Sequence, residues 1–207
     1  ETAIKGVDSI KSIENIAVIP DRIEAGTFLI AAAAIGEKVE ITNIIPEHLE
    51  SVVKCLKEAN VNIEVSDNSI IVQSDNKNIS STNIETNEYP GFPTDLQAQW
   101  MMLMCLANGT STIKENIYYD RFTHIMELNR LGCNIKLEDS ISIIEGDRSL
   151  IGADVMSTDI RASAALIIAA LCAKGTTKIS RVYHIDRGYD KIEEKLTNIG
   201  AEIFRKK

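Results

Sequence analysis

Hydrophobic residues along the chain fall into two alternating helical patterns. The first pattern is apolar on nearly every side and occurs three times between an aspartate and a glycine, at 21–36, 95–109 and 159–175. Aspartate is a favoured N-cap, and glycine suits the left-handed position that follows a helix. We therefore predict a helix in each segment, buried on all sides.

The second pattern is one-sided. Leu49, Val52, Val53 and Leu56 are spaced i, i+3, i+4 and i+7, and similar stripes occur at 122–131 and 189–199. This spacing predicts helices with one apolar face and one solvent face. β-type runs follow the helices of both kinds, and they predict strands at 38–42, 62–65, 69–72, 111–113, 134–137, 141–144, 177–179 and 201–204.

These elements form a β-α-β-α-β-β unit that is present about three times, at 15–74, 84–146 and 153–207. We expect a single α/β (α+β) domain over 1–207, in which three buried helices are enclosed by sheets, the inverse of the usual barrel. Residues 2–6 resemble the strand that the third unit lacks, so we predict that they pair with this unit. The chain begins with Glu1 rather than Met, which suggests a piece of a longer protein.

Composition limits the functional classes. The net charge of −8 argues against general binding of nucleic acid or an anionic membrane. The longest apolar run, 162–173, is too short to span a bilayer. The cysteines and histidines are scattered, which indicates buried or incidental thiols in a reducing compartment and no metal site; they are Cys55, Cys105, Cys133, Cys172, His48, His124 and His184.

Charged residues gather where the predicted buried helices begin. Asp21, Asp95 and Asp159 are equivalent, and capping explains each one alone. If the units are related by a threefold axis, however, the three helix N-termini face one end of the domain and favour anions. Four arginines at loop or helix starts fit recognition of phosphate or carboxylate better than isolated surface ion pairs do; they are Arg22, Arg121, Arg161 and Arg187. No P-loop, dinucleotide motif or serine–histidine–aspartate order occurs, and we expect no cofactor.

Four motifs in order resemble the family of UDP-N-acetylglucosamine enolpyruvyl transferases: PDRIEAGT at 20–27, GFPTDLQAQ at 91–99, TDIRAS at 158–163 and YHIDRGY at 183–189. The resemblance covers essentially the whole chain and the C-terminal portion of the family. It implies an enolpyruvate transferase-like inside-out α/β barrel and a missing N-terminal domain. It also implies phosphoenolpyruvate and UDP-N-acetylglucosamine as substrates in the intact enzyme, in the cytoplasm, at the first committed step of peptidoglycan synthesis.

The resemblance also implies roles for five residues. Asp95 matches the carboxylate that contacts the sugar 3-hydroxyl and deprotonates it, and it is expected to act as both cap and base. Ile117 matches a backbone contact to the nucleotide sugar, and Arg121 lies in the same loop. Arg187 matches an arginine that engages phosphoenolpyruvate, and Arg161 one of the charge network around the closed site. The isolated chain is expected to be inactive. The alternatives are a shikimate 3-phosphate enolpyruvyl transferase domain and a non-catalytic ligand-binding repeat module.

Overall fold

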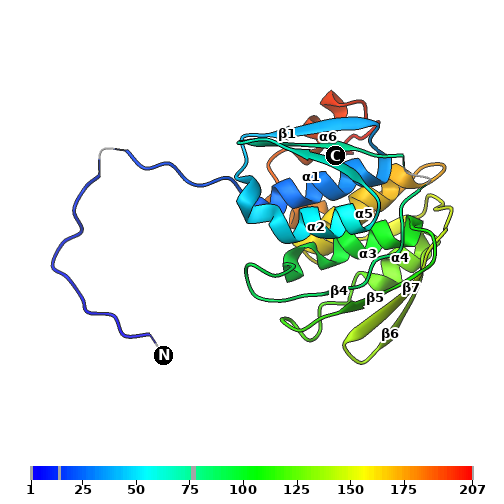
Figure 1. Ribbon diagram of the computed structural model, residues 1–207, viewed down its shortest axis with the longest axis horizontal. Helices are drawn as coiled ribbons and strands as arrows, with labels where there is room; N and C mark the ends of the chain where they lie inside the picture. The colour runs from blue at the N-terminus through cyan, green and yellow to red at the C-terminus, as the bar shows by residue number, and fades with distance from the viewer. Residues whose placement is uncertain (1, 14, 76–77, 207) are drawn as a thin grey trace.

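Three helices form the interior of the domain in a computed structural model that describes residues 2–13, 15–75 and 78–206. They pack against one another and lie side by side in Figure 1. Nine of the ten residues of the middle helix are buried, because its sequence is apolar on every side. The prediction of three buried helices is thus confirmed, and their bounds are α1 Arg22–Ile35, α3 Gln97–Leu106 and α5 Ile160–Cys172.

Three sheets cover these helices. The first has the order β1-β3-β2, with antiparallel pairs throughout, and the second has the order β4-β5-β7-β6. In the third, β8 pairs with β9 in parallel, as β4 pairs with β5. The strands are β1 Lys38–Thr42, β2 Asn62–Val65, β3 Ser69–Gln73, β4 Ile84–Glu85, β5 Thr110–Lys114, β6 Asn134–Glu138, β7 Ile141–Glu145, β8 Asp154–Met156 and β9 Lys178–Ser180.

The one-sided helices bury a single stripe each, as predicted. In the first of them only Val52, Val53 and Leu56 are buried, and these residues belong to the apolar stripe of the sequence. The helices are α2 Glu50–Glu58, α4 Ile125–Arg130 and α6 Ile192–Asn198, and short 3₁₀ turns precede helices at η1 Pro46–Leu49, η2 Thr94–Leu96 and η3 Val182–Arg187.

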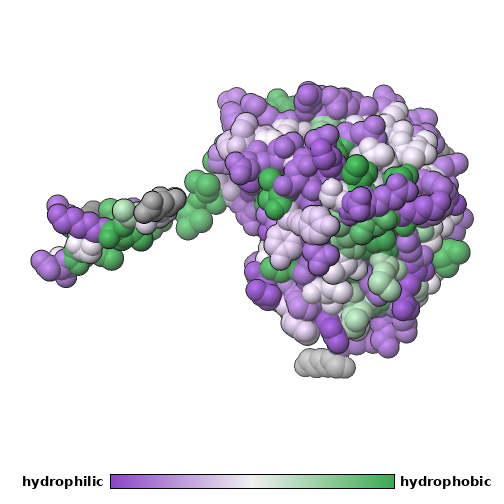
Figure 2. Space-filling model, turned by 90° about the horizontal axis from the view of Figure 1, so that it is seen from below, coloured by the Kyte–Doolittle hydropathy of each residue, from purple (hydrophilic) through white to green (hydrophobic). Residues whose placement is uncertain are grey.

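The N-terminal segment differs from its prediction. Residues 2–6 form no strand and do not pair with the third unit, and Ile4 is 89% exposed. The opening strand expected near residue 15 is also absent among residues 15–21, where Val18 is 91% exposed. Figure 1 shows this segment running away from the body, and Figure 2 shows apolar side chains along it. A terminal strand needs contacts that hold it in place, and residues 7–13, which follow this segment, are all exposed.

Two other expectations are corrected. Residues 201–204 form no strand, and Phe204 is 73% exposed, because the described residues offer no neighbouring strand like those that pair with β2 and β6. Gly36 follows α1 with a φ of −82°, so it is not in the left-handed conformation. A Cβ there would lie 2.8 Å from the carbonyl oxygen of Ala32, so close backbone approach explains this glycine better.

Candidate active site

Asp95 lies in the 3₁₀ turn that leads into α3, and its carboxylate caps no helix. Pro93 is the N-cap of this turn, and neither η2 nor α3 has a side-chain cap. Asp21 and Asp159, by contrast, accept backbone N–H bonds at the starts of α1 and α5. The expectation that Asp95 is both cap and base is therefore wrong in its first half. The 3₁₀ turn already starts at Thr94, so the Asp95 side chain lies within the turn and not at its N-cap position.

Two arginines hold the Asp95 carboxylate instead. Arg121 Nη1 donates to Asp95 Oδ1 at 2.8 Å, and Arg161 Nε donates to the same oxygen at 3.2 Å. All three side chains are partly buried, with 36% of Asp95 exposed. Burial alone would raise the pKa of Asp95, but the Arg121 hydrogen bond and the two guanidinium charges outweigh it and lower the pKa below its usual value. Asp95 is therefore an ionised carboxylate at neutral pH.

Arg121 is positioned by its own loop and by α3. Gln97 Nε2 donates to the backbone carbonyl of Arg121 at 3.2 Å, and Gln97 is fully buried. The Arg121 guanidinium lies 5.2 Å from the ring centre of Tyr118, within cation–π range. It also reaches Thr94 Oγ1 at 3.3 Å. The contacts place a cation over the turn that carries Asp95.

Arg161 is supported by a buried polar cluster that joins all three interior helices. Tyr189 OH lies 2.7 Å from Thr27 Oγ1 of α1, and Gln99 Nε2 of α3 donates to the same Thr27 hydroxyl at 3.0 Å. The Tyr189 hydroxyl also lies close to the Arg161 side chain, and burial raises the pKa of Tyr189, so the hydroxyl stays protonated at neutral pH. In the sequence Tyr189 belongs to an apolar stripe and ends the motif at 183–189, and neither pattern predicts this role. Its hydroxyl at a buried position was the signal for this role.

His124 is a buried histidine beside the α5 N-terminus, with 1% of its surface exposed and Nε2 unpartnered. Burial lowers its pKa to about 4; the charge of Asp159 opposes this shift and that of Arg121 adds to it. The imidazole is therefore neutral at neutral pH. It packs next to a cap and carries no charge toward a substrate.

Ile117 lies in the loop after β5, and 44% of it is exposed. Its backbone N–H donates to Glu115 Oε1 at 2.9 Å. Because this donor is already used, a ligand at this position would meet the carbonyl oxygen. No role of Glu115 was predicted from the sequence, although a glutamate stands there between a predicted strand and an apolar loop.

Arg187 ends η3 and is exposed. No ion pair joins it to Asp95 in the described part of the chain. The residue after it, Gly188, packs over the start of α5, since a Cβ there would lie 3.7 Å from Arg161 Nη1. Arg205 donates to Asp186 Oδ2 at 2.9 Å and fixes this turn from the other side. Among the described residues Arg187 thus takes part in no ion pair, and the glycine that follows it lies beside Arg161.

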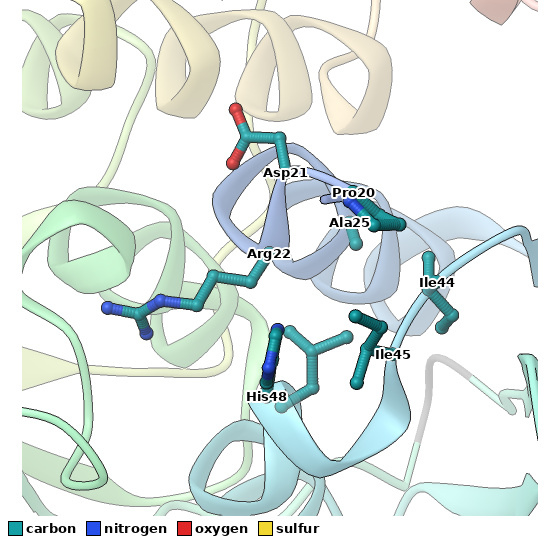
Figure 3. Close-up of a pocket in the computed structure, with 8 residues that line it drawn as sticks. Pro20, Asp21, Arg22, Ala25, Ile44, Ile45 and His48 are labelled. Atoms are coloured by element: carbon teal, nitrogen blue, oxygen red, sulfur yellow. The ribbon is translucent and has the colours of Figure 1, made fainter. Parts of the chain in front are cut away.

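Arg22 makes its contact away from the group formed by Asp95, Arg121 and Arg161. Figure 3 shows Arg22 and Asp21 pointing to different sides of α1. The Arg22 guanidinium lies 5.2 Å from the centre of the Tyr89 ring, and His48 meets that ring edge-on. The hollow beside them has a volume of about 0 Å³ open to a water molecule, far below the few hundred Å³ typical of ligand pockets. The cation–π contact with Tyr89 explains why an arginine stands in the first turn of α1, where the helix dipole disfavours a cation.

Two partly buried cysteines offer no reactive thiolate. Burial raises the pKa of Cys55 to about 11 and that of Cys172 to about 12. Cys105, Cys133 and the other two are free thiols. No cluster of three or more metal-binding side chains occurs in residues 2–13, 15–75 and 78–206, and over the same residues no helix is long and apolar enough to cross a membrane.

Comparison with known proteins places this arrangement in a family. The model of the EPSP synthase (3-phosphoshikimate 1-carboxyvinyltransferase) family matches residues 1–196. The chain belongs to this family. A UDP-N-acetylglucosamine 1-carboxyvinyltransferase of Chlorobium luteolum is 49% identical over 207 residues, covering 100% of this chain and 48% of that protein. One of Campylobacter fetus is 52% identical over 204 residues, covering 99% and 48%. The chain thus spans about half the length of these relatives.

Solved structures of the same fold agree with this assignment. The enolpyruvyl transferase NikO from Streptomyces tendae superimposes with a TM-score of 0.84 at 27% identity, over 90% of this chain and 44% of that one. An EPSP synthase from Acinetobacter baumannii gives a TM-score of 0.70 at 13% identity, over 92% and 44%. At this identity the second match shows the fold alone. The resemblance and the fold class expected from the sequence are both confirmed.

Proposed function

We propose that this chain is one domain of a larger enzyme that transfers enolpyruvate from phosphoenolpyruvate to the 3-hydroxyl of UDP-N-acetylglucosamine. The identity of 49–52% to relatives named UDP-N-acetylglucosamine 1-carboxyvinyltransferase supports this acceptor. The span of about half their length supports a second domain, which we place N-terminal to this one and across the active site. The protein then acts in the cytoplasm at the first committed step of peptidoglycan synthesis, and so serves cell-wall formation and division.

The observation that carries the proposal is the Asp95 carboxylate, ionised between two arginines and released from capping. Addition of a hydroxyl to the enol double bond needs a base on oxygen and an acid at the terminal carbon. In the first step the sugar oxygen bonds to C2 of phosphoenolpyruvate, its proton passes to Asp95, and an acid of the other domain protonates C3. In the second step C3 loses a proton and phosphate leaves, which restores the double bond.

Three arginines fit the two anionic groups of phosphoenolpyruvate. Arg121, Arg161 and exposed Arg187 supply forked donors for phosphate and carboxylate, and they stabilise the tetrahedral intermediate. Arg121 and Arg161 now bind Asp95. An anionic substrate competes for them, and as it draws them away the pKa of the half-buried carboxylate rises, which makes it a better base. The backbone carbonyl of Ile117, a partly exposed residue, is the proposed contact for the nucleotide sugar.

The test is phosphate release by the full-length parent protein, supplied with phosphoenolpyruvate and either of two acceptors. We expect turnover with UDP-N-acetylglucosamine and none with shikimate 3-phosphate. The reverse preference would favour the shikimate enzyme, although the EPSP synthase from Acinetobacter baumannii is only 13% identical to this chain. Binding of the nucleotide sugar without any phosphate release would indicate a non-catalytic binding module.

A matched assay addresses the division into domains. The 207-residue chain should release no phosphate alone, and mixing it with a separately produced N-terminal half should restore release. Turnover by this chain alone would contradict the division.

A further inference from the structure

Glu115 is a buried carboxylate surrounded by neutral donors. Only 3% of its surface is exposed, at the end of the second sheet. Oε1 accepts from Thr86 Oγ1 at 2.7 Å and from the backbone N–H groups of Ile117 and Tyr118 at 2.9 Å each. Oε2 accepts from Thr94 Oγ1 at 2.9 Å. No ion pair neutralises Glu115 among the described residues. A buried charge of this kind is costly, so its place calls for a reason beyond closing a loop.

The two oxygens of Glu115 reach two different parts of the candidate site. Oε1 fixes the loop that presents Ile117. Oε2 fixes Thr94, the residue before Asp95. One side chain therefore sets the distance between the proposed nucleotide-sugar contact and the proposed base.

The Thr94 bond also has a direction. A threonine hydroxyl has one hydrogen, and a carboxylate can only accept, so Thr94 gives its hydrogen to Glu115. Toward Arg121, which only donates, Thr94 must then offer a lone pair. Arg121 Nη1 lies 3.3 Å from Thr94 Oγ1 and 2.8 Å from Asp95 Oδ1. Its two hydrogens can serve both acceptors, and the chain runs from Glu115 through Thr94 and Arg121 to Asp95.

We propose that Glu115 is a positioning residue of the transferase site, which holds Thr94 as an acceptor for Arg121 and so orients the cation on Asp95. The role as a positioning residue for catalysis rests on the proposed function. The negative charge is what keeps the Thr94 hydroxyl pointed in one direction. A neutral amide in the same place would close the loop equally well and would lose this control.

Glu115→Gln separates the two jobs of the side chain. Its carbonyl oxygen must face the three donors at Oε1, because an NH₂ group there would meet other donors. The NH₂ group then faces Thr94 and turns that hydroxyl away. Thr94→Val removes the same link from its other end. Thr86→Val is the matched control, because it removes a hydroxyl donor from the same carboxylate without touching the one that meets Arg121.

The experiment measures phosphate release and thermal unfolding of the full-length parent with these three changes. Loss of one hydrogen bond next to charged groups predicts a fall in kcat of about tenfold for Glu115→Gln and for Thr94→Val. The KM for UDP-N-acetylglucosamine should stay within about twofold, because the Ile117 loop is kept. The double variant should fall no further than either single one, since both break one chain of contacts. Thr86→Val should leave kcat within about twofold.

Three results would overturn the proposal. They are an unchanged kcat in Glu115→Gln, additive losses in the double variant, and an equal loss in Thr86→Val. If the wild-type parent releases no phosphate, the proposed function has failed, and a carboxyl NMR titration of Asp95 in the 207-residue chain decides on Glu115. An Asp95 pKa that rises in Glu115→Gln and stays unchanged in Thr86→Val then supports the chain of contacts. The same Asp95 pKa in the wild type and both variants refutes it.

Discussion

The start of α1 and the start of α3 hold equivalent aspartates that do different work. Asp21 Oδ1 accepts the Ile23 N–H at 2.7 Å and caps its helix. Asp95 accepts no backbone N–H and binds two guanidinium groups. The difference comes from Pro93, which caps a 3₁₀ turn through its own backbone and places the aspartate two positions inside the turn. A capping residue in a repeat can thus be released for chemistry by moving the helix start.

The largest expected effect is on turnover. Asp95→Asn in the full-length parent should lower kcat by roughly 10²–10⁴-fold, the usual contribution of a general base. Its free energy of unfolding should change by less than about 1 kcal/mol, because the pair with Arg121 and Arg161 is partly solvent-exposed. Steady-state phosphate release and urea unfolding measure the two quantities. Near-normal turnover together with a large loss of stability would return Asp95 to a structural role.

The second effect concerns the region beside the Asp159 cap. His124 has a folded-state pKa of about 4, below the value of about 6.5 in an unfolded chain. Its contribution to stability is complete above pH 6.5 and is lost as the pH falls toward 4, because the unfolded state binds the proton first. The loss is on the order of 3 kcal/mol.

Urea unfolding between pH 7 and pH 4 measures this loss. In His124→Asn the free energy of unfolding should fall less between pH 7 and pH 4 than it does in the wild type. An identical pH dependence in both proteins would show that other groups cause it.

The repeat and both helix types follow from the sequence, because period and polarity are local properties. Of the eight strands predicted from β-type runs, seven formed for the same reason. The opening strand of the first unit did not form among residues 15–21. The strand at 201–204 and the pairing of residues 2–6 failed because a strand depends on a partner elsewhere in the chain. Local pattern reports the tendency of a segment, and only the tertiary structure supplies its partner.

The candidate site was partly predictable. The motif match selected Asp95, Arg121 and Arg161 among its five residues, and the structure brings these three together. Arg187, which it also selected, is exposed. Glu115 and Tyr189 were missed because each acts across the fold, on partners up to 162 residues away. No spacing rule connects such residues.

A third effect tests the support of Arg161. Tyr189→Phe removes the hydroxyl that meets Thr27 and Arg161, which should cost about 1 kcal/mol of stability. It should also lower kcat, because Arg161 loses a fixed contact. Tyr183→Phe is the control, since Tyr183 is 58% exposed and should show neither effect. Equal behaviour of the two variants in unfolding and turnover would contradict the supporting role.

The smallest effect tests the comparison itself. Asp21→Ala removes a cap and should cost about 1 kcal/mol, whereas Asp21→Asn should cost only a few tenths, because asparagine also caps. Asp95→Ala should cost less than Asp21→Ala, and its cost should shrink in 1 M salt, because an ion pair is screened. Urea unfolding of the three variants at low and high salt measures these differences. A salt-independent cost of about 1 kcal/mol in Asp95→Ala would mean that the carboxylate caps α3 in solution after all.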